Sequence, residues 1–130
     1  MTDEKNLVRQ AIELLDDRKA ENIVLIDLNE VPIPTSYFII ADTDNTAHAK
    51  ALVNVLREGL PIKPNHSEGF KERKWIVLDY GDFVVHVFER GARAFYDIES
   101  LWSDHVVDPE DAVGAKIGVP STPAPGQEVA

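Results

Sequence analysis

The sequence predicts an α/β (α+β) domain in which a small mixed β-sheet is flanked by helices. Three observations support this fold class. Two segments carry apolar residues at helical spacing, several short segments are rich in β-branched residues, and the two kinds of segment are interleaved along the chain. With 130 residues, of which 44% are hydrophobic and 28% charged, the composition is that of one globular domain.

The N-terminal segment predicts a helix that begins after Thr2, its expected N-cap. Asp3 and Glu4 fall in the first turn, where the helix dipole favours acidic side chains. The apolar residues recur every three or four positions and should form the buried face of this helix: Leu7, Val8, Ala11, Ile12 and Leu15.

Two strands and a second helix are expected next. Residues 22–28 (NIVLIDL) are short and largely β-branched or apolar, which is typical of a strand covered on both faces, and a loop with two prolines separates them from a strand at residues 37–41. Thr46 is the expected N-cap of a helix that ends at Gly59. The prolines of residues 61–68 permit only an irregular or edge strand there.

The C-terminal half predicts a β-hairpin followed by a short helix. Residues 75–79 and 83–89 are rich in strand-forming residues, and Asp and Gly between them suit a tight turn. Residues 96–103 are expected to form the helix. The residues of this helix that should face inward are Ile98, Leu101 and Trp102.

The predicted domain spans residues 1–108, and residues 109–130 are expected to be a flexible tail rich in proline, glycine and small residues. The chain has no cysteine, which excludes disulfides, thiolate metal sites and cysteine nucleophiles. The N-terminal segment lacks a signal-peptide pattern, and no stretch is apolar enough to span a membrane. A cytoplasmic location is therefore expected.

The formal charge of −10 is the strongest global constraint on partners. A surface this negative is repelled by nucleic acids and anionic lipids and is attracted to basic surfaces. Residues 97–111 contain six acids and no Lys or Arg, whereas Lys71, Arg73 and Lys74 form a small basic patch. Two readings of the acidic run stay open: a solvated face that maintains solubility, or a docking surface for a basic partner.

Catalysis has one weak candidate, the acidic pair Asp42 and Asp44 after the strand at residues 37–41. Two carboxylates at a strand end could hold Mg²⁺ for nucleotidyl or phosphoryl transfer. Nucleotidyltransferases also need an upstream glycine-serine turn that cradles phosphates, and this dipeptide occurs nowhere in the chain. The four histidines do not have zinc-site spacing, so no metal or cofactor is expected.

An aromatic and acidic cluster occupies the hairpin. Strand alternation places Trp75 and Asp79 on one face of their strand, and Leu78 and Tyr80 on the other. On the next strand, His86 shares a face with Val84 and Phe88. Such residues suit a protein interface, but they equally suit a core closed by aromatic side chains. For His86 in particular, a satisfied core position is favoured over a contact role.

Residues 75–88 (WIVLDYGDFVVHVF) and 95–104 (FYDIESLWSD) together resemble the ribosomal silencing factor family, also called Iojap-like proteins. The resemblance extends over roughly residues 5–105. It implies a mixed sheet related to the nucleotidyltransferase fold without the catalytic residues, and therefore a protein that is not an enzyme. The family implies a translational repressor that binds ribosomal protein number fourteen of the large subunit and blocks joining of the small subunit under nutrient limitation.

The resemblance also implies where the partner binds: on the last two long strands of the sheet and the segment after them. The expected contact residues are Trp75, Leu78, Asp79, Tyr80, His86, Tyr96 and Trp102. It implies no cofactor, no membrane and no requirement for direct nucleic-acid binding, in a monomer or homodimer. The alternatives are a metal-dependent nucleotidyl or phosphoryl transferase and a generic acidic adaptor protein.

Overall fold

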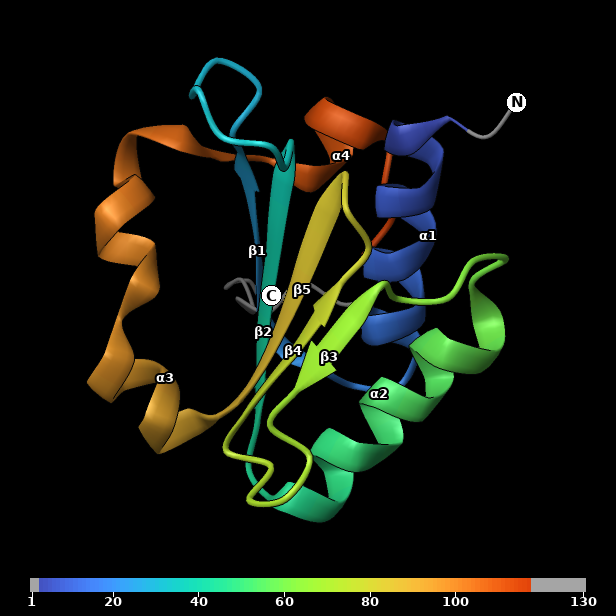
Figure 1. The fold of residues 1–130 in the computed structure, drawn as a ribbon, viewed down its shortest axis with the longest axis vertical. Helices are drawn as coiled ribbons and strands as arrows, with labels where there is room; N and C mark the ends of the chain where they lie inside the picture. Colours follow the sequence, from blue (N-terminus) through green and yellow to red (C-terminus); the bar gives the residue numbers. More distant parts are fainter. Residues whose placement is uncertain (1–2, 118–130) are drawn as a thin grey trace, which may run out of the picture.

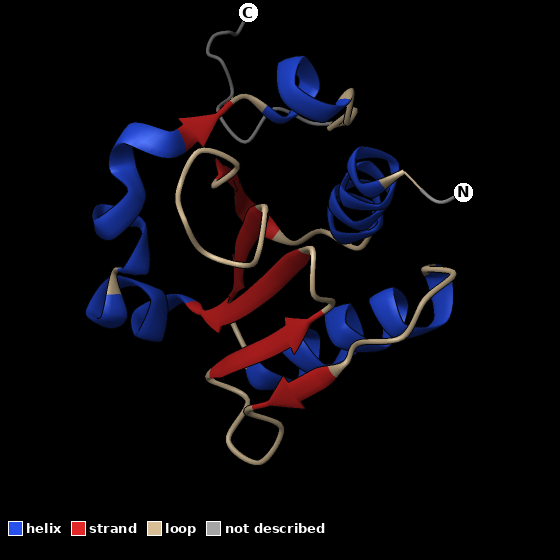
Figure 2. Ribbon diagram, turned by 45° about the horizontal axis from the view of Figure 1, so that its top comes forward, coloured by secondary structure: helices blue, strands red, loops and turns tan. Residues whose placement is uncertain are grey.

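The computed structural model describes residues 3–117, which form a six-stranded mixed sheet with helices on both faces (Figures 1 and 2). The strand order is β3-β4-β5-β2-β1-β6. The strands are β1 Glu21–Asp27, β2 Tyr37–Thr43, β3 His66–Glu68, β4 Trp75–Asp79, β5 Phe83–Glu89 and β6 Val106–Val107. Only β2 and β5 pair in parallel among these strands, and the other neighbours are antiparallel. The predicted fold class is confirmed.

Two long helices, α1 (Glu4–Asp17) and α2 (Thr46–Gly59), cover one face of the sheet (Figure 1). The buried residues of α1 are the five predicted from its periodicity, and α2 ends at Gly59 as predicted. Both N-caps were predicted one residue away from their actual positions. Asp3 accepts the backbone N–H of Lys5, and Asn45 accepts that of His48 at 2.7 Å. Asp and Asn compete well with Thr for this role because their side-chain oxygens reach the same free N–H groups.

The opposite face has a smaller apolar cluster. Short segments cover it in part: the 28–36 loop, the helix α3 (Arg90–Tyr96) and the 3₁₀ helix η1 (Ile98–His105). The sheet contributes Ile26, Ile40 and Phe88 to this cluster. The central strands β1, β2 and β5 thus have buried side chains on both faces, which explains their nearly continuous apolar sequences.

The predicted hairpin is confirmed by β4 and β5. Trp75 lies opposite Phe88 in the antiparallel register, and the Tyr80 N–H donates to the Phe83 carbonyl at 2.9 Å. Gly81 has a φ of 90°, and its N–H donates to Oδ1 of Asp79 at 2.8 Å. Glycine adopts this left-handed conformation without steric cost, so the turn fits the sequence Asp-Tyr-Gly-Asp.

The predicted helix at residues 96–103 is wrong in its bounds. The chain instead forms α3, breaks at Asp97 with a φ of 45°, and continues as η1. Ile98 and Trp102 pack against the sheet as predicted, but Leu101 is 76% exposed. A 3₁₀ helix has three residues per turn rather than 3.6, and η1 is also kinked at Trp102, so α-helical spacing does not give its buried face.

The predicted tail begins too early. Residues Pro109–Val113 form the helix α4, which lies against α1, and Ala115 is fully buried in the helix-covered core (Figure 1). Asp108 caps α4, and Gly114 ends it in the left-handed conformation. The rest of the predicted tail, residues 118–130, lies outside the described residues. No helix within residues 3–117 is long and apolar enough to cross a membrane.

Candidate functional site

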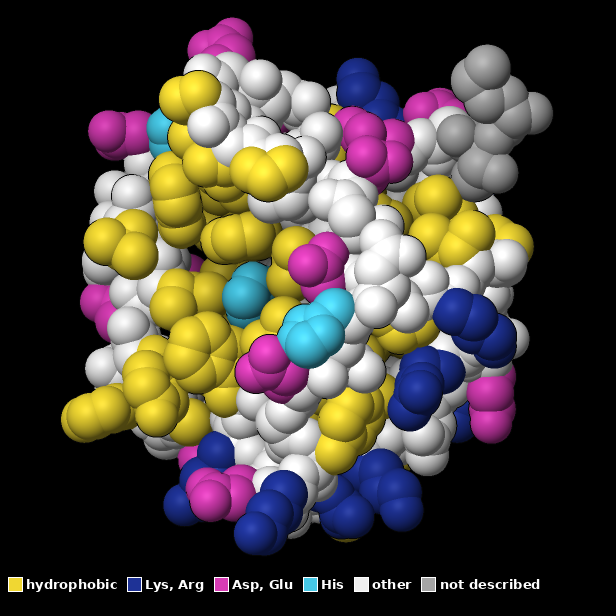
Figure 3. All heavy atoms as spheres, in the orientation of Figure 1, with side chains coloured by type: hydrophobic (Ala, Val, Ile, Leu, Met, Phe, Trp, Pro, Cys, Tyr) yellow, Lys and Arg dark blue, Asp and Glu magenta, His cyan; other side chains and the backbone are white. Residues whose placement is uncertain are grey.

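The sheet face opposite α1 and α2 carries a group of rings that we call the aromatic surface. Its members come from β2, β4, β5, α3 and η1: Phe38, Trp75, His86, Phe88, Tyr96 and Trp102. Figure 3 shows hydrophobic side chains gathered around a hollow on this side of the molecule, between the sheet and the α3–η1 segment. Within residues 3–117 no long helix covers this side, whereas α1 and α2 cover the opposite face.

The rings of the aromatic surface form one contiguous network. The Trp75 ring stacks on Phe88 with a centroid distance of 5.0 Å and lies 4.7 Å from Tyr96. Phe38 meets His86 edge-on at 4.7 Å and Trp102 edge-on at 6.3 Å. Such pairs add stabilisation beyond area burial, so the rings are held in place before any partner arrives. Prepositioned aromatic side chains are typical anchors of protein interfaces.

His86 occupies the middle of this network and is neutral. Burial lowers the pKa of His86 from its ordinary 6.5 to about 4. Its Nδ1 accepts the indole N–H of Trp75 at 3.1 Å, and because an indole only donates, the imidazole proton must be on Nε2. Nε2 is buried without a hydrogen-bond partner in the described part of the chain. His86 is thus a buried residue that positions Trp75; the satisfied core position favoured from the sequence is found at Nδ1 but not at Nε2, and its contact role stays a prediction.

Four of the seven predicted contact residues belong to the aromatic surface: Trp75, His86, Tyr96 and Trp102. Leu78 and Tyr80 do not. Both are buried in the helix-covered core, and burial raises the pKa of Tyr80 to about 12. Asp79 is half-buried at the end of β4, where its carboxylate accepts the turn N–H. Leu78 and Tyr80 lie on the opposite face of the sheet from the aromatic surface, because strand alternation points them away from Trp75.

Three apolar residues on this side were not among the predicted contact residues. Phe38 joins the aromatic surface from β2, where alternation from the core residues Tyr37 and Ile39 would have placed it on this face. Phe95 and Leu101 are 80% and 76% exposed on α3 and η1. No helical periodicity distinguishes these two, because the chain changes helix type between them.

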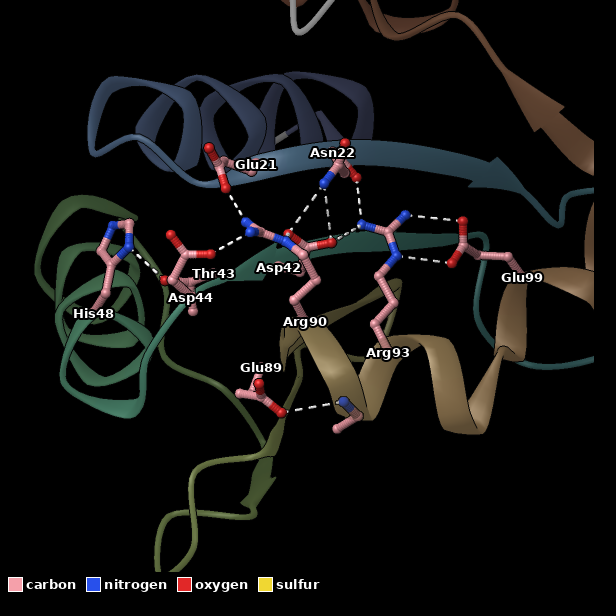
Figure 4. A network of polar contacts seen from close by, with 11 residues as sticks. Glu21, Asn22, Asp42, Thr43, Asp44, His48, Glu89, Arg90, Arg93 and Glu99 are labelled. Carbon is pink, nitrogen blue, oxygen red and sulfur yellow. Dashed lines mark hydrogen bonds and ion pairs between the residues drawn. The ribbon is translucent and has the colours of Figure 1, made fainter.

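A network of charged residues fastens the α3–η1 segment to the sheet (Figure 4). Asp42, only 2% exposed at the end of β2, receives Nε of Arg90 at 3.2 Å and Nη1 of Arg93 at 3.0 Å. Arg93 also makes two 2.8 Å bonds to Glu99 of η1 and one of 2.6 Å to the Asn22 carbonyl. Although burial opposes its charge, these bonds to Glu99 and Asp42 raise the pKa of Arg93. The network sets the position of Tyr96 and Trp102.

The same network bears on the possible metal pair. Asp42 and Asp44 both contact the guanidinium of Arg90, and Asp42 is shared with Arg93 (Figure 4). Cations thus already neutralise the carboxylates that a metal ion would need. Within residues 3–117, no group of three or more His, Asp or Glu side chains is arranged to hold a metal ion. We call this structural network around Asp42, Arg90 and Arg93 the charged clasp. Its signal in the sequence was the two arginines in the segment that follows β5.

Comparison with known proteins identifies relatives of the whole domain. The family model described as "ribosomal silencing factor during starvation" matches residues 1–128. Proteins named ribosomal silencing factor from Chromobacterium violaceum and Halalkalibacterium halodurans are 34% and 31% identical over 114 and 105 residues. These matches cover 85% and 77% of this chain, and 92% and 88% of the relatives. A mouse protein named mitochondrial assembly of ribosomal large subunit protein 1 is 28% identical, over 71% of this chain and 43% of its own length.

Solved structures share the fold as well as the sequence. A crystal structure of a protein from Chromobacterium violaceum superposes with a TM-score of 0.75 at 32% identity, covering 78% of this chain and 88% of its own. A second, from Bacillus halodurans, gives 0.70 at 28% identity, with 81% and 99% covered. The family model spans almost the entire chain, and the relatives agree with it in both sequence and fold. The chain therefore belongs to the ribosomal silencing factor (Iojap-like) family.

Proposed function

We propose that this protein binds the large ribosomal subunit through ribosomal protein number fourteen and sterically blocks joining of the small subunit under nutrient limitation. Membership of a family named for ribosomal silencing during starvation supports a role in repressing translation. The mouse relative, named for assembly of the large ribosomal subunit, supports that subunit as the partner. The open aromatic surface is the single structural observation that carries the proposal.

The aromatic surface has the make-up of an interface that binds a basic protein. Trp75, Tyr96 and Trp102 supply large aromatic anchors, and Phe95 and Leu101 extend the apolar area outward on α3 and η1. The exposed acids Asp97 and Asp104 lie on or beside η1, where they would attract the basic side chains common in ribosomal proteins.

The mechanism needs no chemical step. A standard interface occupies about 800 Å² on each partner, and a bound domain of this size occludes a surface that the small subunit needs. The charged clasp around Asp42 holds α3 and η1 in place, so little ordering entropy is lost when the partner binds. The same residues that resemble a metal site in sequence thus serve to preorganise the interface.

Cosedimentation with isolated large subunits tests this proposal. We expect the protein to sediment with large subunits and to reduce formation of joined ribosomes. Leu101→Asp should weaken binding about tenfold or more, because a charge would be buried in the apolar part of the interface. Ala47→Asp adds the same charge at an exposed position of α2, on the other face of the sheet, and should bind normally.

Two outcomes would contradict the proposal. The first is that the unmodified protein does not sediment with large subunits and leaves subunit joining unchanged. The second is that Leu101→Asp and Ala47→Asp bind equally well, which would move the contact away from the α3–η1 side. Circular dichroism of both variants controls for folding.

A further inference from the structure

The charge of this acidic protein is unevenly distributed. Residues 57–74 contain five basic and three acidic residues, a net charge of +2, while the rest of the chain carries −12. We call the five cations of this segment the basic edge: Arg57, Lys63, Lys71, Arg73 and Lys74. They lie at the end of α2 and around β3 and the 69–74 loop, at the β3–β4 edge of the sheet. The opposite sheet edge, formed by β6 with η1 and α4 next to it, carries the acidic run.

The cations of the basic edge are not used in ion pairs within residues 3–117. Arg90 and Arg93, by contrast, have carboxylate partners. Arg57 lies over the Phe70 ring at 5.5 Å, and Nζ of Lys63 donates to the Arg57 carbonyl at 2.9 Å. Figure 3 shows Lys and Arg side chains gathered along the lower and right-hand margins of this view of the molecule. The charges are therefore available to a partner.

The 69–74 loop is a defined turn that presents three of these cations, Lys71, Arg73 and Lys74, next to the aromatic surface. Gly69 has a φ of 94°, and a Cβ there would lie 2.0 Å from the Trp75 carbonyl oxygen, so only glycine fits. The Arg73 N–H closes the turn on the Gly69 carbonyl at 2.9 Å, and the Lys74 carbonyl accepts the Glu89 N–H at 2.9 Å. The turn shares an open hollow with the aromatic surface, and the lining of this hollow includes Trp75, Tyr96, the two lysines Lys71 and Lys74, and one acid, Glu72.

We propose that the basic edge contacts phosphates of ribosomal RNA beside the protein that the aromatic surface binds. This inference rests on the proposed function. A chain with a charge of −10 is repelled by RNA in most orientations, so the side with local positive charge is the one that can approach phosphates closely. The hollow joins Lys71 and Lys74 to Trp75 and Tyr96, so phosphates at the basic edge would lie directly beside the protein bound by the aromatic surface. The sheet edge that carries the acidic run then faces basic protein, and the basic edge faces RNA. This fixes the orientation of the bound domain.

Two triple variants with the same change in net charge test the inference. One is K71E/R73E/K74E in the basic edge. The control is K5E/K19E/K50E, which alters exposed lysines of α1, the turn after it and α2. Affinity for isolated large subunits is measured over a range of salt concentrations. Each lost phosphate contact reduces the slope of log affinity against log salt by about 0.7–0.9.

We expect the basic-edge variant to bind at least about tenfold more weakly and to lose about two units of salt slope, while the control stays within about threefold. With isolated ribosomal protein number fourteen, free of RNA, the basic-edge variant should bind like the unmodified protein. A loss there too would assign the contact to protein and overturn the inference, as would equal behaviour of the two triple variants on subunits. Failure of the unmodified protein to bind subunits would overturn the proposed function together with the inference.

Discussion

The two faces of the sheet are built from the same strands but closed in different ways. One face is covered by α1 and α2, each with 14 residues, and forms the larger core cluster. In the described part of the chain the other face is covered only by the 28–36 loop, α3 and η1, and none of the eight residues of η1 is fully buried. Apolar packing holds the first cover, whereas charged contacts add to the packing of Ile98 and Trp102 in holding the second. Stability is thus concentrated on one face, and exposed aromatic area for a partner on the other.

The largest effect should come from the helix-covered face. Phe83 is fully buried there, and Phe83→Ala should lower the free energy of unfolding by about 4 kcal/mol, because it removes apolar contacts and leaves a cavity. Phe95→Ala, at a position 80% exposed on the other side, should change it by less than about 0.5 kcal/mol. Urea denaturation measures both. Similar losses in the two variants would refute the contrast between the faces.

The second effect concerns the charged clasp. Asp42→Ala leaves Arg93 without one of its two carboxylate partners in a buried site and should cost about 3 kcal/mol. Asp44→Ala removes an exposed partner of Arg90 and should cost less than about 1 kcal/mol. Hydrogen exchange adds a local measurement: Asp42→Ala should speed exchange in residues 90–105 more than in α1. Uniform exchange changes would mean that the clasp does not act on α3 and η1.

The third effect is a pH dependence centred on His86. Its pKa is about 4 in the folded protein and near 6.5 when unfolded, so between these values only the unfolded chain takes up the proton. The free energy of unfolding is therefore unaffected by His86 above pH 6.5. It falls by up to about 3 kcal/mol as the pH decreases towards 4, because the unfolded chain is stabilised by protonation. His86→Asn keeps an acceptor for Trp75 but cannot titrate, so its unfolding free energy should fall less between pH 7 and pH 4.5. Parallel curves for both proteins would contradict this assignment.

Much of the fold follows from local patterns in the sequence. Helical spacing in α1, the stop at Gly59 and the turn between β4 and β5 were all predictable, because they depend on neighbouring residues and on turn chemistry. The cap residues Asp3 and Asn45 were each missed by one position, since several adjacent polar residues could fill the role. The helix α4 and the burial of Ala115 were not predicted, because small residues and prolines are also typical of a mobile chain.

The candidate site was predictable only in part. Alternation along β4 and β5 correctly divided their residues into two faces, but it did not say which face the long helices cover. Leu78 and Tyr80 lie under α1 and α2, whereas Trp75 and His86 lie on the open side. The exposed position of Leu101 also depends on the left-handed residue Asp97 and the change to a 3₁₀ helix.

By itself, the sequence determined the class of fold, the acidic charge, the absence of cysteine and the segments that share the family pattern, because each of these is a property of composition or short-range order. Only the tertiary structure decided which aromatic residues are accessible. It also showed that Asp42 is clasped by Arg90 and Arg93, and that the basic and acidic segments lie at opposite sheet edges. The physical reason is that exposure and charge pairing arise between residues as far as 69 positions apart, as in the pair of Arg90 and Glu21, which no local pattern specifies.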